Sequence, residues 1–254
     1  MKAVILAAGE GTRLRPLTLD RPKPMLPIGG APLLEHLIHL LAQHGVQDIA
    51  INLHYKPGVV SAYCGDGSQW GVRLTYSIEE TILGTAGAVR RLQPFLDERF
   101  FVLYGDVLTD LDLAALDRFH TAQQAALTAA LYHVPRPWEC GIVDMDSSGR
   151  ISRFVEKPPR AAVFSDLANA GIYVMEPSLI TAIPPDAFYD FGRDLFPSLL
   201  RHGAAIYGYP IGPDDYLLDI GSPDKYEEAN RDWAEGRVKH GARDGRAGSV
   251  QTPR

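Results

Sequence analysis

The chain has 254 residues, of which 46% are hydrophobic and 22% charged, and its formal net charge is −6. This composition excludes a disordered chain, and the length suits one large domain or two small ones. Residues 236–254 hold five lysines and arginines against one acid, so the body up to Glu235 is more acidic than the whole chain. An acidic body disfavours non-specific binding of nucleic acid, which requires a basic face.

The cysteines and the N-terminus argue against a secreted or membrane protein. Cys64 and Cys140 form no disulfide framework and have no zinc-ligand spacing. The apolar run that begins the chain is too short for a secretory signal, because Gly9 and Glu10 interrupt it. No run approaches the roughly 18 apolar residues of a membrane span. We therefore expect a cytoplasmic protein without a membrane partner.

Strand and helix patterns alternate through the first half of the chain. Short apolar runs predict strands over 3–7, 48–53, 72–77, 100–104 and 126–134. Runs with helical periodicity predict helices over 32–44, 85–92 and 113–123. This alternation favours a Rossmann-like α/β fold, in which helices cover both faces of a mostly parallel sheet.

The second half has a different pattern. Residues 146–149 form a polar turn that ends in glycine and separates two short apolar runs, which predicts a hairpin of strands over 141–145 and 150–155. Further strands are expected over 170–175 and 204–209, and helices over 191–201 and 226–234. Ser222 and Pro223 suit the start of the last helix. We expect a mixed sheet with an antiparallel insertion over residues 1–235, followed by a disordered basic tail over 236–254.

The most informative segment directly follows the first strand. Residues 6–18 read LAAGEGTRLRPLT, and residues 22–27 read PKPMLP. Glycines in this position allow the backbone to approach a phosphate closely. Leu14 stands where a dinucleotide-binding motif needs its third glycine, and the Gly-Lys-Ser/Thr of a Walker A loop is absent. Four cations still crowd this loop of an acidic chain, namely Arg13, Arg15, Arg21 and Lys23.

The loop resembles the signature of sugar-1-phosphate nucleotidylyltransferases. The matching residues are Gly9, Gly11, Thr12, Arg13, Leu14, Pro16, Leu17, Thr18, Lys23, Pro24 and Met25. The resemblance extends to about residue 235, and it is greatest to mannose-1-phosphate guanylyltransferases of a short form that lacks a C-terminal β-helix domain. It implies a catalytic domain over 1–235 that converts an NTP and a sugar 1-phosphate to an NDP-sugar and pyrophosphate. GTP and mannose 1-phosphate are the expected substrates.

The resemblance implies two segments that hold the nucleotide. Arg13 and Lys23 would counter the charge that develops on the phosphate oxygens during in-line attack. Glu79 and Glu80 could accept hydrogen bonds from guanine, although a solvated acidic turn explains them equally well. Gly87 offers no side chain where some relatives that use pyrimidines carry glutamine. The nucleotide-binding residues implied are Leu6, Ala8, Gly9, Gly11, Thr12, Arg13, Glu80, Gly84 and Thr85.

Two separated aspartates are the candidate metal ligands. Asp106 ends a predicted strand, and such strand ends face the ligand crevice of open α/β sheets. Asp219 is a lone acid behind two leucines. Mg²⁺ takes one or two carboxylates together with phosphate oxygens. The resemblance implies that these two residues hold Mg²⁺, and that Asp106 acts with Arg13 and Lys23 as the catalytic set.

The residues that bind the sugar phosphate are expected in the second half of the chain. The resemblance implies that Glu156 contacts sugar hydroxyls, Lys157 the sugar phosphate and Asn169 the sugar, and that the backbone of Gly141 meets the sugar ring. Taken alone, Glu156 and Lys157 would be an exposed charge pair, and Gly141 would be a glycine at a strand start.

Three other functions stay open at this point. One is a uridylyl- or thymidylyltransferase that acts on a glucose-type or amino-sugar 1-phosphate. Another is a catalytically silent regulatory subunit that binds a nucleotide sugar, although Arg13, Lys23, Asp106 and Asp219 are all retained. A nicotinamide dehydrogenase is disfavoured by Leu14. A homo-oligomer is compatible with the sequence.

Overall fold

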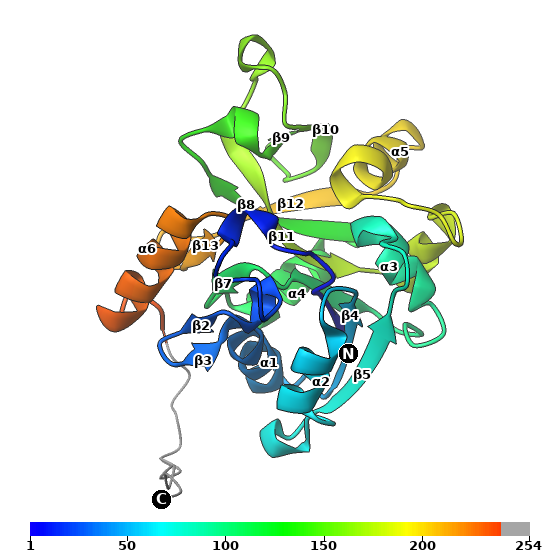
Figure 1. Ribbon diagram of the computed structural model, residues 1–254. Coiled ribbons are helices and arrows are strands. Elements are labelled where there is room, and N and C mark those ends of the chain that lie inside the picture. The colour runs from blue at the N-terminus through cyan, green and yellow to red at the C-terminus, as the bar shows by residue number, and fades with distance from the viewer. Residues whose placement is uncertain (240–254) are drawn as a thin grey trace, which may run out of the picture.

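The computed structural model describes residues 1–239, which form a nine-stranded sheet flanked by helices (Figure 1). One path through the sheet runs β10-β9-β11-β6-β1-β4-β5, and β8 pairs with both β11 and β12. The strands are β1 (Lys2–Leu6), β4 (Asp48–Leu53), β5 (Arg73–Ile78), β6 (Phe100–Tyr104), β8 (Leu127–His133), β9 (Gly141–Met145), β10 (Ile151–Glu156), β11 (Leu167–Met175) and β12 (Ile206–Pro210).

The direction of the strands changes halfway across the sheet. β6, β1, β4 and β5 are mutually parallel. β11 runs antiparallel to β6 and to β8, and β9 and β10 form an antiparallel hairpin. The mixed sheet and its antiparallel insertion, both expected from the sequence, are confirmed.

Helices cover both faces of the sheet, as predicted. α1 (Leu33–Gln43), α2 (Pro57–Cys64) and α4 (Leu113–Ala122) pack into one hydrophobic cluster. α3 (Gly84–Arg91) and α5 (Phe196–Arg201) pack into a second cluster on the other face. The residues 191–195 that precede α5 form a π-helical turn within the predicted helix.

A third, smaller cluster joins segments that are far apart in the sequence. It contains Leu14, Leu26, Leu108 and Ile220 together with Ala229 of α6 (Pro223–Ala234). Two short sheets lie in this region. They consist of β2 (Pro27–Ile28) with β3 (Ala31–Pro32), and β7 (Val107–Thr109) with β13 (Leu217–Asp219).

The structure extends the predictions at several places. The sequence analysis missed α2 and the two short sheets, because segments of two to eight residues carry too little periodicity. β11 begins at Leu167, three residues before the predicted strand. In the predicted tail, Val238 is buried and the Lys239 amide donates to Asp110 Oδ2 at 2.8 Å, whereas residues 240–254 lie outside the described residues. Among the described helices, none is long and apolar enough to cross a membrane.

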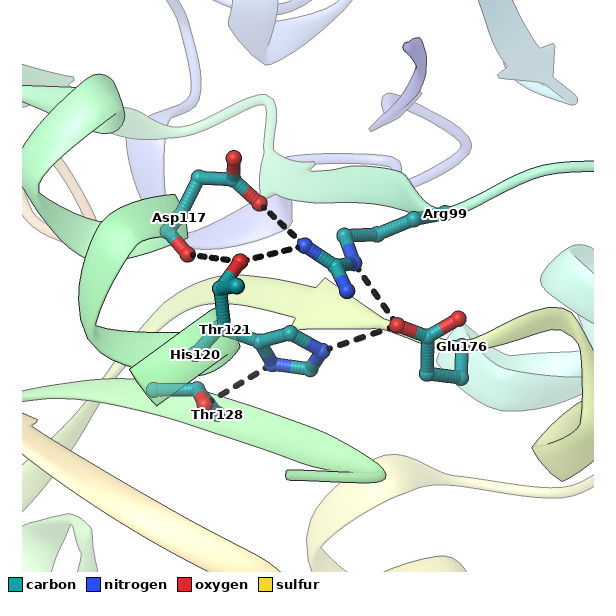
Figure 2. Close-up of polar contacts among 6 residues, drawn as sticks. All are labelled: Arg99, Asp117, His120, Thr121, Thr128 and Glu176. Atoms are coloured by element: carbon teal, nitrogen blue, oxygen red, sulfur yellow. Dashed lines mark hydrogen bonds and ion pairs between the residues drawn. The ribbon is translucent and has the colours of Figure 1, made fainter. Parts of the chain in front are cut away.

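Figure 2 shows a polar network that joins α4 to Arg99, directly before β6, and to Glu176, directly after β11. His120 is fully buried, and its Nδ1 lies 2.9 Å from the Thr128 hydroxyl while its Nε2 lies 3.3 Å from Glu176. The Arg99 guanidinium donates to the same Glu176 carboxylate at 2.7 Å. Burial lowers the pKa of His120, and the bond to Glu176 opposes this effect only in part. The lowered pKa favours the neutral imidazole at pH 7.

We predict that His120 makes the protein less stable in mild acid. Because the folded state binds the histidine proton less readily than the unfolded state, the free energy of unfolding falls as the pH drops below about 6.5. His120→Asn should lower this free energy by about 1–3 kcal/mol at pH 7.5. The difference between wild type and variant should shrink at pH 5.5, as measured by urea unfolding at both values.

The exposed His202, changed to Asn, is the control and should leave the free energy of unfolding unchanged at both pH values. A difference between wild type and His120→Asn that stays constant with pH would contradict a neutral, buried imidazole.

Candidate active site

Two adjoining cavities open where the parallel strands end. Their volumes are about 340 and 390 Å³. Tyr104, Asp106 and Asp190 line both of them, so the cavities meet at the carboxyl end of β6. Ligands of open α/β sheets bind at this edge. Asp106 thus lies where a residue that follows a buried central strand is expected to lie.

The first cavity is formed by the glycine loop and the start of α3. Its lining includes five residues expected to bind nucleotide, which are Leu6, Ala8, Gly9, Gly84 and Thr85. Gly11, Thr12 and Glu80 lie outside the linings of both cavities. Gly11 has a φ of +65° and its carbonyl accepts a hydrogen bond from the Thr18 hydroxyl at 2.8 Å, so it shapes the loop.

The second cavity gathers the residues expected on the sugar side. Its lining includes Gly141, Glu156, Lys157 and Asn169. Arg13 and Asp219 line the same cavity. The glycine loop therefore contributes to both cavities, since Gly9 lies in the first and the exposed Arg13 in the second.

Lys23 lies between the two candidate metal ligands. Its Nζ is 2.6 Å from Asp106 Oδ2 and 3.4 Å from Asp219 Oδ1, and Lys225 Nζ lies 3.9 Å from Asp219 Oδ2. Burial raises the pKa of the Asp219 carboxyl, and the charge of Asp106 raises it further. Two carboxylates this close together are stabilised by cations, which is the role of Lys23 here.

The short sheet of β7 and β13 brings these aspartates together. Asp219 is paired with Val107, and the Ile220 amide donates to the Asp106 carbonyl at 2.9 Å. The side chains of Leu108 and Ile220 pack in the third hydrophobic cluster with Leu14 of the glycine loop. Apolar burial therefore positions Lys23, Asp106 and Asp219, although they are far apart in the sequence.

The carboxylates at this junction fit a hard divalent cation. Carboxylate oxygens are the ligands that Mg²⁺ prefers, and it completes its coordination with water and phosphate oxygens. Within residues 1–239, no cluster of three or more histidine, cysteine or acidic side chains is placed to hold a metal. A cation bound between Asp106 and Asp219 would therefore require ligand oxygens as well.

The segment around Tyr189 packs against the N-terminal turn of α3. The amides of Ala86 and Gly87 donate to the Tyr189 carbonyl at 3.0 and 2.9 Å. A Cβ at Gly84 would come within 2.6 Å of that carbonyl oxygen, and one at Gly87 within 2.7 Å of the Ala187 carbonyl oxygen. Glycine at position 87 is thus required by packing, which explains it without reference to the nucleotide base.

Thr85 is held by the same segment. Its hydroxyl donates to Asp190 Oδ2 at 2.9 Å and accepts from the Phe191 amide at 2.9 Å. The other oxygen of Asp190 accepts from the Gly192 amide at 3.0 Å. Thr85 therefore connects the first cavity to the helical turn that carries part of the second.

Glu156 occupies a space that two glycines create. A Cβ at Gly141 or at Gly192 would lie 2.5 Å from Glu156 Oε2, so neither position has room for a side chain while the carboxylate stays in place. Burial raises the pKa of the Glu156 carboxyl, and the nearby Lys157 ammonium opposes this rise. Lys157 Nζ lies 3.9 Å from Glu156 Oε1 and is largely exposed.

A β-bulge orients Asn169. The register between β11 and β8 shifts between Asn169 and Tyr173, and Gly171 there has a φ of +73°. The Asn169 side-chain amide donates to the Tyr173 hydroxyl at 2.7 Å and its oxygen accepts from the Gly171 amide at 3.2 Å. Bulges commonly re-aim a side chain next to a site, and this one fixes the Asn169 amide at the edge of the second cavity.

The polar lining residues that the sequence analysis missed include Asn52, Tyr104, Asp190 and Arg193. Arg193 is exposed and adds a third cation, besides Arg13 and Lys157, to the lining of the second cavity. The segment over 191–201 was predicted only from its helical periodicity, and no motif marked the arginine. Glu79 is also placed differently, because it is buried instead of lying in a solvated turn, whereas Glu80 is exposed.

The glycine loop, the cations and the two carboxylates lie together beside the carboxyl end of β6, an arrangement that suits an α/β protein with a phosphorylated ligand. A sequence profile of the nucleotidyl transferase family matches residues 2–236. The chain belongs to this family.

Similar proteins differ in the nucleotide and sugar that they use. The chain is 39% identical to the UTP–glucose-1-phosphate uridylyltransferase of Synechocystis sp., over 94% of this chain and 65% of that protein. It is 40% identical to the mannose-1-phosphate guanylyltransferase of Mycobacterium tuberculosis, over 92% of this chain and 65% of that protein. The chain thus spans about 65% of the length of these curated relatives.

Solved structures share the fold over nearly the whole chain. A structure described as a glucose-1-phosphate thymidylyltransferase from Bacillus anthracis superimposes with a TM-score of 0.84 at 26% identity, covering 96% of this chain and 98% of that one. HddC from Yersinia pseudotuberculosis gives a TM-score of 0.76 at 27% identity, covering 91% of this chain and 99% of that one.

We predict that the space at Gly141 is essential for the packing around Glu156. Gly141→Ala forces its Cβ against Glu156 Oε2 and Phe154, and overpacking of this kind should lower the free energy of unfolding by about 1–3 kcal/mol. The control is Gly58→Ala in α2, where no atom lies within 4 Å of an added Cβ.

Gly58→Ala should raise the free energy of unfolding by about 0.5–1 kcal/mol, because alanine is the better helix former. Urea unfolding measures both variants. Equal effects of the two substitutions would show that the tight space at Gly141 does not matter for stability.

Proposed function

We propose that the protein transfers a nucleotidyl group from an NTP to a sugar 1-phosphate, giving an NDP-sugar and pyrophosphate. The observation that supports this proposal most directly is the junction of the two cavities, where Lys23 contacts both Asp106 and Asp219. One cavity is lined by glycines and small apolar residues, which let a nucleotide approach the backbone, and the other holds cations beside the partly buried carboxylate of Glu156. The reacting phosphorus would lie between them.

The chain's own groups can supply most of the chemistry. The attacking oxygen belongs to a phosphate that is ionised at neutral pH, so no protein base is needed. Lys23 and Arg13 counter the charge on the non-bridging oxygens, as a point charge and a planar donor respectively. Holding both substrates in line accounts for much of the remaining rate. Mg²⁺ held by Asp106 and Asp219 would supply additional neutralisation of the triphosphate charge.

The residues of the second cavity suit a sugar phosphate. Lys157 and Arg193 are cations that can bind its phosphate, and Glu156 and Asn169 offer hydrogen bonds to hydroxyl groups. Within the described residues, Arg13 has no carboxylate partner, which leaves it available for phosphate oxygens. The different lining residues of the two cavities suit a reaction in which the nucleotide binds in one cavity and the sugar phosphate in the other.

We propose GTP and mannose 1-phosphate as the substrates, in agreement with the name of the Mycobacterium relative. Glu80 is exposed two residues before Ile82, which lines the first cavity, and we assign it to the guanine donor edge. UTP or dTTP with a glucose-type sugar 1-phosphate is the alternative, in agreement with the names of two other similar proteins. The cytoplasmic location is also a proposal, and it is based on the sequence.

The first test is pyrophosphate release with magnesium across five NTPs and several sugar 1-phosphates. We expect one pair, GTP with mannose 1-phosphate, to be preferred. Asp106→Asn should lower kcat by on the order of a hundredfold or more, because it removes a charge from the junction. Glu227→Gln, an equal loss of charge on the exposed face of α6, should leave kcat unchanged.

A preference for UTP or dTTP would contradict the proposed substrates, whereas the proposed transfer reaction would still hold. No turnover by a folded protein that still binds a nucleotide sugar would contradict the transferase and support the silent regulatory subunit.

The role of Arg193 can be separated from that of the nucleotide pocket. Arg193 lines only the second cavity and not the first. Arg193→Ala should therefore raise KM for the sugar 1-phosphate by roughly tenfold to a hundredfold, which is the loss expected when hydrogen bonds to a charged group are removed. KM for the NTP should stay unchanged. Arg201→Ala, an exposed position on α5, is the control. A rise in KM for the NTP instead would show that Arg193 binds the nucleotide, which would contradict its proposed role in binding the sugar phosphate.

A further inference from the structure

A chain of buried hydrogen bonds links the two walls of the first cavity. The Ala7 amide, at the start of the glycine loop, donates to Asn52 Oδ1 at 2.7 Å. Asn52 Nδ2 donates to Glu79 Oε1 at 2.9 Å. The Leu83 amide, directly before α3, donates to Glu79 Oε2 at 3.0 Å. Two side chains thus connect the start of the glycine loop to the segment directly before α3.

The two side chains have too little access to solvent for water to replace these bonds. Asn52 is 3% exposed and Glu79 is 2% exposed. The backbone of Glu79 is fixed as well, because its amide donates to the Leu53 carbonyl at 2.8 Å and its carbonyl lies 2.8 Å from His54 Nδ1. A buried polar group without a partner is destabilising, so each bond in the chain constrains the next.

The direction of the hydrogen bonds determines which residue fits at position 79. The Ala7 amide can only donate, so Asn52 must turn its oxygen toward Ala7 and its amino group toward Glu79. The Leu83 amide also can only donate. The residue at position 79 therefore faces two donors and must offer two acceptors. An ionised carboxylate does so, whereas a glutamine would turn an amino group toward one of the donors.

Both ends of this chain shape the first cavity. Leu6, Ala7 and Gly84 line it, and Asn52 itself reaches its surface. On the other side of β1, the Gly105 amide donates to the Leu6 carbonyl at 2.8 Å, which ties the same segment to the turn that carries Asp106. Asn52 and Glu79 therefore link the glycine loop to the start of α3 directly behind this cavity.

We propose that Asn52 and Glu79 are a positioning pair that holds the nucleotide pocket at the right width, and that position 79 requires a carboxylate for this reason. The pair does not contact the base, since both Glu79 oxygens are already used inside the protein. The inference rests on the proposed function in one respect, which is that the first cavity takes the nucleotide.

An exchange of the two groups tests the proposal. In Glu79→Gln, the new amide at position 79 turns an amino group toward the Asn52 amino group. In Asn52→Asp, two carboxylates face each other. In the double variant N52D/E79Q, the carboxylate at position 52 can accept from the Ala7 amide and from the amino group at position 79. The amide oxygen at position 79 then accepts from the Leu83 amide. The double variant thus restores every donor–acceptor pair with the opposite direction of the central bond.

We expect Glu79→Gln to raise the Kd of GTP, measured by calorimetry without sugar phosphate, on the order of tenfold, which is typical of coupled buried partners. N52D/E79Q should return the Kd to within about threefold of wild type. In turnover assays the KM for the sugar 1-phosphate should stay unchanged in all variants. Glu227→Gln controls for the loss of one negative charge.

Several results would overturn the positioning role. One is wild-type nucleotide affinity in Glu79→Gln. Another is a lower unfolding midpoint without a change in the Kd, which would make the pair merely structural. A third is a folded double variant that binds GTP no better than Glu79→Gln. If Glu79→Gln does not fold, the affinity of the double variant alone decides.

The binding assay also separates this proposal from the proposed reaction. A wild-type protein that binds GTP or UTP but forms no pyrophosphate would contradict the reaction, while the variants would still test the pair. A wild-type protein that binds neither nucleotide would overturn both proposals.

Discussion

The contact of one lysine with two aspartates places the strongest demand on this fold. Lys23 belongs to the loop after β1, Asp106 to the turn after β6 and Asp219 to the end of β13. Carboxylates so close together repel unless a cation lies near them, and Lys23 is only 8% exposed. The charges can be brought together only where apolar packing fixes all three segments. The cluster that contains Leu14, Leu108 and Ile220 provides that packing.

The two cavities are coupled through the segment that follows Ala187. The Tyr189 carbonyl accepts hydrogen bonds from the amides of Ala86 and Gly87 in the first turn of α3. Asp190 accepts a hydrogen bond from the Thr85 hydroxyl and also caps the helical turn that contains Arg193. Residues that line the first cavity and residues that line the second therefore share one hydrogen-bonded connection. The proposed transfer reaction would benefit from such a connection, because reacting groups must be held within tight limits.

Much of the architecture could be predicted from local patterns. The predicted bounds of β4, β6 and β9 agree with the structure, because each of these strands is a mostly apolar segment beside a turn signal. The glycine loop could be found because its residue types and spacing occur within one short segment. Arg193 and Asn52 could not be found, since an arginine in a helical pattern and an asparagine in a strand are common and carry no spacing of their own.

The sequence by itself determined the class of fold, the position of the glycine loop and several of the charged residues that line the cavities. These features depend on neighbours within a few residues, where periodicity and motif spacing carry the information. Only the tertiary structure decided that Lys23 would lie between Asp106 and Asp219, that packing would require glycine at position 87, and that Glu79 would be buried behind the pocket. The physical reason is that these contacts join segments far apart in the chain, which become neighbours only when the hydrophobic clusters form.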